Sequence, residues 1–206
     1  VTQTDATCGN SNGTATIGAT TGGILPLSYS FNGAPFSTTT AYTGLAAGSY
    51  AVIVKDANGC TFTTSVIISN IPGPSALAVT STNTTCGAAN GTLTIGTVTG
   101  GTTAYTYSVN ASAFTATTNY TALVAGTYNV VVKDANGCTF TTTATIIDIP
   151  GPTAVATTIT NTTCGNSNGA VAIGAVTGGT PAYLYSCNGS PFTATRCYTL
   201  LASGPY

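Results

Sequence analysis

The sequence predicts an all-β protein made of tandem immunoglobulin-like antiparallel β-sandwich repeats of 78 residues. Three observations support this prediction: short segments alternate polar and apolar residues, Gly-rich turns separate them, and the whole pattern recurs at a fixed step. No stretch has the periodicity of an amphipathic helix. Six or seven short strands in 78 residues are typical of a sandwich of the immunoglobulin type.

The strands are clearest in the second repeat. Residues 92–95 and 105–109 alternate in polarity, and residues 128–132 and 139–147 give two further strands. Between the last two strands lies Asp134-Ala135-Asn136-Gly137. Asn-Gly between alternating segments is a strong hairpin signal, because both residues tolerate the positive φ of a tight turn.

The 78-residue step is exact in the cysteines. One set occurs three times and another twice: Cys8, Cys86 and Cys164, then Cys60 and Cys138. A step of this length suits a small independent domain and is too long for one turn of a solenoid.

Pro-Gly-Pro segments at 72–74 and 150–152 mark the joints between repeats. Two prolines fix φ and limit a hinge, so we expect semi-rigid joints. The predicted domains are 1–71, 72–149 and 150–206, and the third is truncated. The less favoured alternative is that these segments are ordinary loops inside one sandwich.

The composition excludes several functions. Only 3% of the residues are charged, against about 25% in an ordinary domain. General acid–base catalysis relies on His, Glu or an activated Lys, and the chain has no His and no Glu. Its basic residues are Lys55, Lys133 and Arg196, too few for nucleic-acid binding. We therefore predict no enzyme activity, no cofactor and no nucleic-acid partner.

The apolar runs are only a few residues long, far below the roughly 20 needed to span a bilayer. We therefore expect no membrane span. Thr, Val, Ile and Tyr are abundant, and these residues favour a folded, pleated surface over disorder.

Seven cysteines without metal-ligand partners predict disulfides and an oxidising, extracytoplasmic location. Within each repeat the expected pairs are Cys8–Cys60 and Cys86–Cys138. Cys164 stays unpaired, since its counterpart would lie beyond Tyr206 or come from another chain.

Cys187 and Cys197 have no cysteine counterparts in the other repeats. The equivalent positions of the first repeat hold Phe31 and Ala41. Two interpretations stay open. Either they bridge each other across a hairpin, or the degenerate third repeat departs from the pattern without chemical significance.

Several spaced motifs together resemble the SprB repeat of bacterial cell-surface adhesins, found in gliding and related Bacteroidetes. The motifs are Cys-Gly-x-x-Asn-Gly, Thr-Gly-Gly, Tyr-x-Tyr-Ser, Leu-x-Ala-Gly-Thr-Tyr and Val-Lys-Asp-Ala-Asn-Gly-Cys. The matching residues are Cys86, Asn90, Gly91, Gly100, Gly101, Tyr105, Tyr107, Leu123, Ala125, Gly126, Tyr128, Asp134, Asn136, Gly137 and Cys138. The resemblance implies secretion by the type IX route, display at the cell surface as a filament or adhesin, and no catalysis.

Other candidate sites have a structural interpretation that we favour. Lys55-Asp56 and Lys133-Asp134 are expected to flank hairpins, with the Asp side chain bonded to the turn; ligand contact is the alternative. Tyr50 and Tyr128 are expected at sandwich corners with the hydroxyl bonded to backbone. A calcium site around Asp5 and Asp148 is disfavoured, because Ca²⁺ takes six or more oxygens and several carboxylates.

The sequence thus predicts a structural or adhesive repeat segment of a secreted surface filament. The expected partners are neighbouring copies of the chain or its repeats, and glycans or surfaces. The alternative is a carbohydrate-binding or accessory module of a secreted multidomain protein, which would present a planar patch of exposed aromatic residues.

Overall fold

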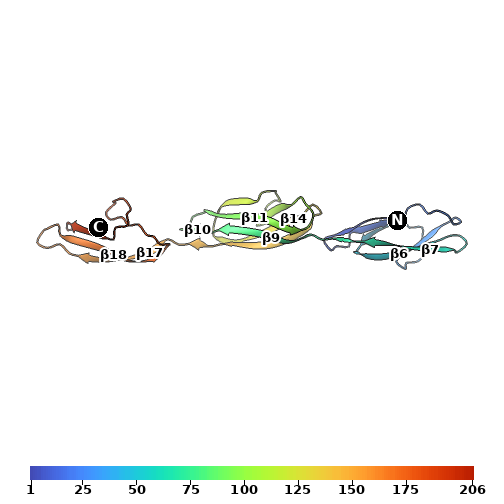
Figure 1. Ribbon diagram of the computed structural model, residues 1–206, viewed down its shortest axis with the longest axis horizontal. Coiled ribbons are helices and arrows are strands. Elements are labelled where there is room, and N and C mark those ends of the chain that lie inside the picture. The colour runs from blue at the N-terminus through green and yellow to red at the C-terminus, as the bar shows by residue number, and fades with distance from the viewer. The chain divides into compact units, whose positions relative to one another are not determined.

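A computed structural model describes all 206 residues, and its regular structure consists of strands alone (Figure 1). The first repeat holds β1 (Thr2–Thr4), β2 (Ala6–Thr7), β3 (Gly13–Thr16), β4 (Ser28–Phe31), β5 (Ala41–Leu45), β6 (Gly48–Lys55), β7 (Thr61–Ile68) and β8 (Asn70–Ile71). The second holds β9 (Pro74–Thr82), β10 (Thr84–Thr85), β11 (Gly91–Gly100), β12 (Thr106–Val109), β13 (Asn119–Leu123), β14 (Gly126–Lys133), β15 (Thr139–Ile146) and β16 (Asp148–Ile149). The third holds β17 (Pro152–Thr160), β18 (Gly169–Gly178) and β19 (Cys197–Leu201). The structure contains no membrane-spanning helix.

The first repeat is a sandwich of two three-stranded sheets, ordered β1-β3-β5 and β4-β6-β7. Alternate side chains of both sheets point inward and form one core, because successive residues of a strand face opposite sides. Ala15, Phe31, Val52 and Ile68 belong to that core, and the Phe31 ring stacks on Tyr42 with 4.0 Å between centroids. The predicted all-β, antiparallel sandwich class is confirmed.

The second repeat has the same sheet orders, β13-β11-β9 and β12-β14-β15. Three of its fully buried side chains, Leu93, Val130 and Ile146, lie 78 residues after Ala15, Val52 and Ile68 of the first core. The third repeat has a single sheet, β17-β18-β19.

Two short parallel pairs accompany the sandwiches. β2 pairs with β8 in the first repeat, and β10 pairs with β16 in the second. Each pair brings the segment just before the repeat's first cysteine beside the segment just before the proline joint. This pairing determines which end of the repeat carries that cysteine.

The chain also divides into two compact units. One comprises Val1–Thr80, Thr94–Asn119 and Tyr128–Ala144, and the other comprises Ser81–Leu93, Tyr120–Thr127 and Thr145–Tyr206. This division passes through strands of the second repeat. The domain boundaries at 71/72 and 149/150 therefore stay a prediction.

Candidate functional site

The two cysteines of the first repeat lie at opposite ends of β7. The Cys8 amide donates at 3.0 Å to the carbonyl of Ile71, the last residue of β8, which follows β7. Cys60 directly precedes β7. Eight residues at about 3.3 Å each make β7 about 26 Å long. A disulfide needs Cα atoms about 4.4–6.8 Å apart. Cys8 and Cys60 cannot bond to each other in this fold.

Cys8 instead forms a disulfide with Cys138, 130 residues further along the chain. Their Cα atoms are 5.3 Å apart, and Cys138 is only 3% exposed. The predicted pairs Cys8–Cys60 and Cys86–Cys138 are therefore wrong. The first cysteine of one repeat bonds the second cysteine of the next, so the cross-link spans the Pro-Gly-Pro joint.

The remaining cysteines carry free thiols. Cys60, Cys86, Cys164 and Cys197 are exposed, and Cys187 is partly buried. Cys164 is unpaired in the structure, and Cys187 and Cys197 do not form the bridge considered from the sequence.

The joint is built closely around the disulfide. A hollow beside it is lined by residues of both flanking segments, among them Asn70, Pro72, Gly73 and Cys138. A Cβ added at Gly73 would lie 2.4 Å from the Cβ of Cys138. Real Cβ atoms do not approach so closely, so only glycine lets the joint pass beside the cross-link.

Cys86 occupies the same place in the second repeat. Its amide donates to the Ile149 carbonyl at 2.9 Å, and the next amide, of Gly87, donates to Asp148 Oδ1 at 2.9 Å. Its sulfur lies 3.3 Å from where a Gly151 Cβ would stand. Cys86 is thus the structural counterpart of Cys8, with its thiol free.

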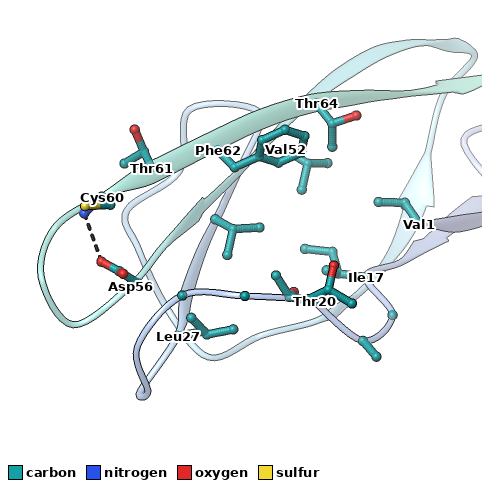
Figure 2. A pocket seen from close by; sticks show the side chains of 16 residues that line it. Val1, Ile17, Thr20, Leu27, Val52, Asp56, Cys60, Thr61, Phe62 and Thr64 are labelled. Carbon is teal, nitrogen blue, oxygen red and sulfur yellow. Dashed lines mark hydrogen bonds between the residues drawn. The ribbon is translucent and has the colours of Figure 1, made fainter.

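An aspartate organises the hairpin next to the second cysteine. Asp56 Oδ1 accepts hydrogen bonds from the amides of Asn58 at 3.0 Å and Cys60 at 2.9 Å, and Oδ2 accepts from Ile24 at 3.2 Å (Figure 2 draws the Cys60 bond). The Ile24 bond is the largest cause that lowers the pKa of Asp56 from its ordinary value, and the other amides act in the same direction. The predicted turn-supporting role of this aspartate is confirmed.

Asp134 repeats this arrangement in the second repeat. It accepts from Asn136 at 3.0 Å, Cys138 at 2.8 Å and Thr102 at 2.9 Å, and it is 4% exposed. This set of hydrogen bonds, the aspartate clamp, thereby fixes the backbone of Cys138, which carries the disulfide.

The neighbouring lysines and tyrosines also have structural contacts. Lys55 Nζ lies 4.0 Å from the centroid of the Phe36 ring, and Lys133 lies 4.2 Å from that of Phe114. The Tyr50 hydroxyl donates to the Ala46 carbonyl at 2.9 Å, which confirms the corner role expected of this residue.

The two aspartates considered for a calcium site accept hydrogen bonds from the protein itself. Asp5 accepts from Ser69 at 2.9 Å, and Asp148 accepts from Gly87 and from the Thr84 hydroxyl.

An asparagine clamp was missed by the sequence analysis. Asn90 Oδ1 accepts from the Thr85 amide at 3.0 Å, and its Nδ2 donates to Thr85 Oγ1 at 2.8 Å. Asn12 and Asn168 make the same two bonds in the other repeats. Its signal was present, because the three asparagines recur at the 78-residue step.

A family-model match agrees with the resemblance seen in the sequence. The SprB repeat family model matches residues 1–36 and 78–114, which confirms that resemblance. None of the curated proteins matches the chain significantly. Among solved structures, the crystal structure of murine CEACAM1b is similar at 13% identity and a TM-score of 0.29, over 71% of this chain and 96% of that one.

Proposed function

We propose that this chain is a structural and adhesive segment of a secreted bacterial cell-surface filament or adhesin, with no catalytic role. The match to the SprB repeat supports a surface adhesin repeat region. The disulfide is consistent with an extracellular location, and we propose secretion by the type IX route.

The observation that carries the mechanical part of this proposal is the disulfide across the joint. Tension applied at the two chain ends passes from Cys8 to Cys138 through the sulfur atoms. The intervening residues, which include β3 to β14, are then shielded from that tension. Such a cross-link lets consecutive repeats bear load without unravelling between its two ends.

The proposed partners are neighbouring copies of the chain or its repeats, and glycans or surfaces. The third repeat has an apolar surface that suits such contact. A hollow on this repeat is lined by apolar and aromatic side chains such as Val155, Ile173, Tyr185 and Tyr198. An apolar face of this kind is suited to packing against another sheet.

Single-molecule stretching tests the load-bearing role. Reduction of the disulfide is expected to lengthen the fully extended chain by about 450 Å, since 130 residues of separation each add roughly 3.5 Å. The Cys60→Ser variant, which leaves the cross-link intact, should behave like the unaltered chain. Equal extension of the oxidised and reduced chains would show that the joint carries no load.

A further inference from the structure

The linker after the joint forms a strand on the second repeat. Pro74–Ala78, the first half of β9, lies against the second half of β11. A Cβ built on Gly96 would lie 3.3 Å from the Ala78 Cβ, and one on Gly101 would lie 2.9 Å from Pro74. Leu77 of this segment is buried, at 8% exposure. The linker is thus part of the second sandwich.

The third repeat uses its linker in the same way. Pro152 pairs with Gly178 and Val155 pairs with Val176 in the β17–β18 ladder. A Cβ on Gly174 would lie 3.3 Å from the Ala156 Cβ, which repeats the Gly96–Ala78 approach. Two separate repeats therefore bind the same kind of segment at the same place.

The corresponding surface of the first repeat carries no such strand, and Val1 lies beside it. β3 ends at Thr16, whereas β11 and β18 continue six residues further relative to the repeat. Gly18 and Gly22, the counterparts of Gly96 and Gly100, would meet nothing within 4 Å. Figure 2 shows the resulting groove, with Ile17, Leu27, Val52 and Phe62 around it and Cys60 at its end.

Burial differs between the two repeats in the same region. Cys60 is exposed and Phe62 is 68% exposed, whereas Cys138 is 3% exposed and Phe140 is partly buried. The groove and the free thiol therefore belong to one surface, and in the second repeat the linker and Cys8 cover its counterpart.

We propose that the Cys60 end of the first repeat is a docking site for the linker of another repeat. The groove over Ile17–Gly23 binds an extended segment of the type Pro-Gly-Pro-Ser-Ala-Leu-Ala as an added strand, and Cys60 bonds the Cys8-type cysteine of the incoming repeat. Backbone hydrogen bonds would give affinity, and the buried leucine would give specificity. The proposal depends on joint geometry and not on adhesion, so it can fail while the load-bearing role stands.

The covalent step is thiol–disulfide exchange with a low-molecular-weight disulfide such as oxidised glutathione. The Cys60 thiolate attacks that disulfide, forms a mixed disulfide and releases one thiolate. The thiolate of the incoming cysteine then attacks the Cys60 sulfur and displaces the second small thiol. Two protein thiols are oxidised, one disulfide is reduced, and the two protons end on the released thiols.

A cysteine-bearing peptide tests the docking. In Cys-Pro-Gly-Pro-Ser-Ala-Leu-Ala, cysteine replaces the residue that corresponds to Ile71, whose carbonyl accepts from the Cys8 amide at 3.0 Å in the occupied joint. The glycine that corresponds to Gly73 is kept, since no Cβ fits there. Incubation of the whole chain with this peptide in a glutathione redox buffer, followed by peptide mapping, should show at least tenfold more capture at Cys60 than at the exposed Cys86. Equal capture at the two cysteines would overturn the proposal.

Two controls separate docking from thiol reactivity. The same peptide with aspartate in place of leucine should lose its preference for Cys60. Gly18→Val, which fills the position facing the docked strand, should also abolish the preference, while Gly9→Ala should not. Retained preference with the aspartate peptide would contradict strand docking, whatever the stability of the Gly18 variant.

A longer chain tests the natural bond. A chain with residues 1–78 duplicated ahead of Val1 keeps the joint sequence, because Ala78 is followed by Val79 as it would be by Val1. Mapping should find Cys8 of the added repeat bonded to Cys60 of the original first repeat. A free Cys60 beside an intact Cys8–Cys138 bond would overturn this part of the proposal.

Discussion

At the residue scale, the joint depends on small groups placed next to sulfur. Gly73 leaves room for the Cys138 Cβ, and Asp134 holds the Cys138 amide at 2.8 Å. Both residues have counterparts at the 78-residue step, Gly151 and Asp56. These contacts act on the backbone of the cysteines, and so they decide where each thiol can reach.

Gly73→Ala is expected to hinder the Cys8–Cys138 bond. The new methyl group would start 2.4 Å from the Cys138 Cβ, so the joint or the disulfide must move. Titration of free thiols under native conditions should reveal two additional thiols in a large fraction of molecules. Gly151→Ala is the matched control, because it faces only the free Cys86 sulfur at 3.3 Å. An unchanged thiol count in Gly73→Ala would contradict the close packing of the joint.

Asp56 predicts a dependence of hairpin stability on pH. Its pKa is lowered in the fold, chiefly by the Ile24 amide, so its stabilising effect is present above the ordinary carboxyl pKa of about 3.9. That effect is lost as the pH falls through the lower pKa of the folded state. An NMR titration of the Asp56 carboxyl carbon should give a midpoint below the ordinary value, and Asp56→Asn should remove this part of the acid sensitivity. A titration midpoint at or above the ordinary carboxyl pKa would disprove the aspartate clamp.

At the element scale, alternation was enough to predict the inner strands. Residues 92–95, 105–109, 128–132 and 139–147 all lie in or across observed strands, because each has one face in a core. The linker strand β9 was missed, since Pro72-Gly73-Pro74 indicated a joint and Leu77 is its one large apolar side chain before Val79. β9 is a strand because it pairs with β11, and a pairing with a distant segment is not visible in the local sequence.

Asn90→Ala is expected to destabilise the segment between β10 and β11. The variant loses two hydrogen bonds to Thr85, at 3.0 and 2.8 Å, each of which contributes on the order of 0.5–1.5 kcal/mol. We expect a loss of about 1–2 kcal/mol, measured by urea unfolding. Asn119→Ala, which has a single 3.5 Å contact with Thr118 among its side-chain bonds, is the control. Equal effects of the two substitutions would show that the clamp has no special role.

At the scale of the whole molecule, the repeat step could not decide the disulfide pairing. Bonds within a repeat and bonds between consecutive repeats both recur at 78 residues, so the spacing is equally compatible with Cys8–Cys60 and Cys8–Cys138. The choice follows from the length of β7, which separates Cys8 from Cys60, and from the β2–β8 pair, which holds Cys8 beside the joint. Alternating patterns predict the strands well. Which cysteines lie at the same end of a repeat depends on how the strands assemble into sheets.

The cross-link should stabilise the first two repeats together. Closing a loop of 130 residues restricts the unfolded chain, which corresponds to about 3–5 kcal/mol in the free energy of unfolding. Cys8→Ser should therefore lower the urea midpoint substantially, and reducing agent should have no further effect on that variant. Cys60→Ser removes an exposed free thiol and should change stability by less than about 0.5 kcal/mol. If both serine variants unfolded at the same urea concentration, the disulfide between repeats would contribute nothing to the stability of the array.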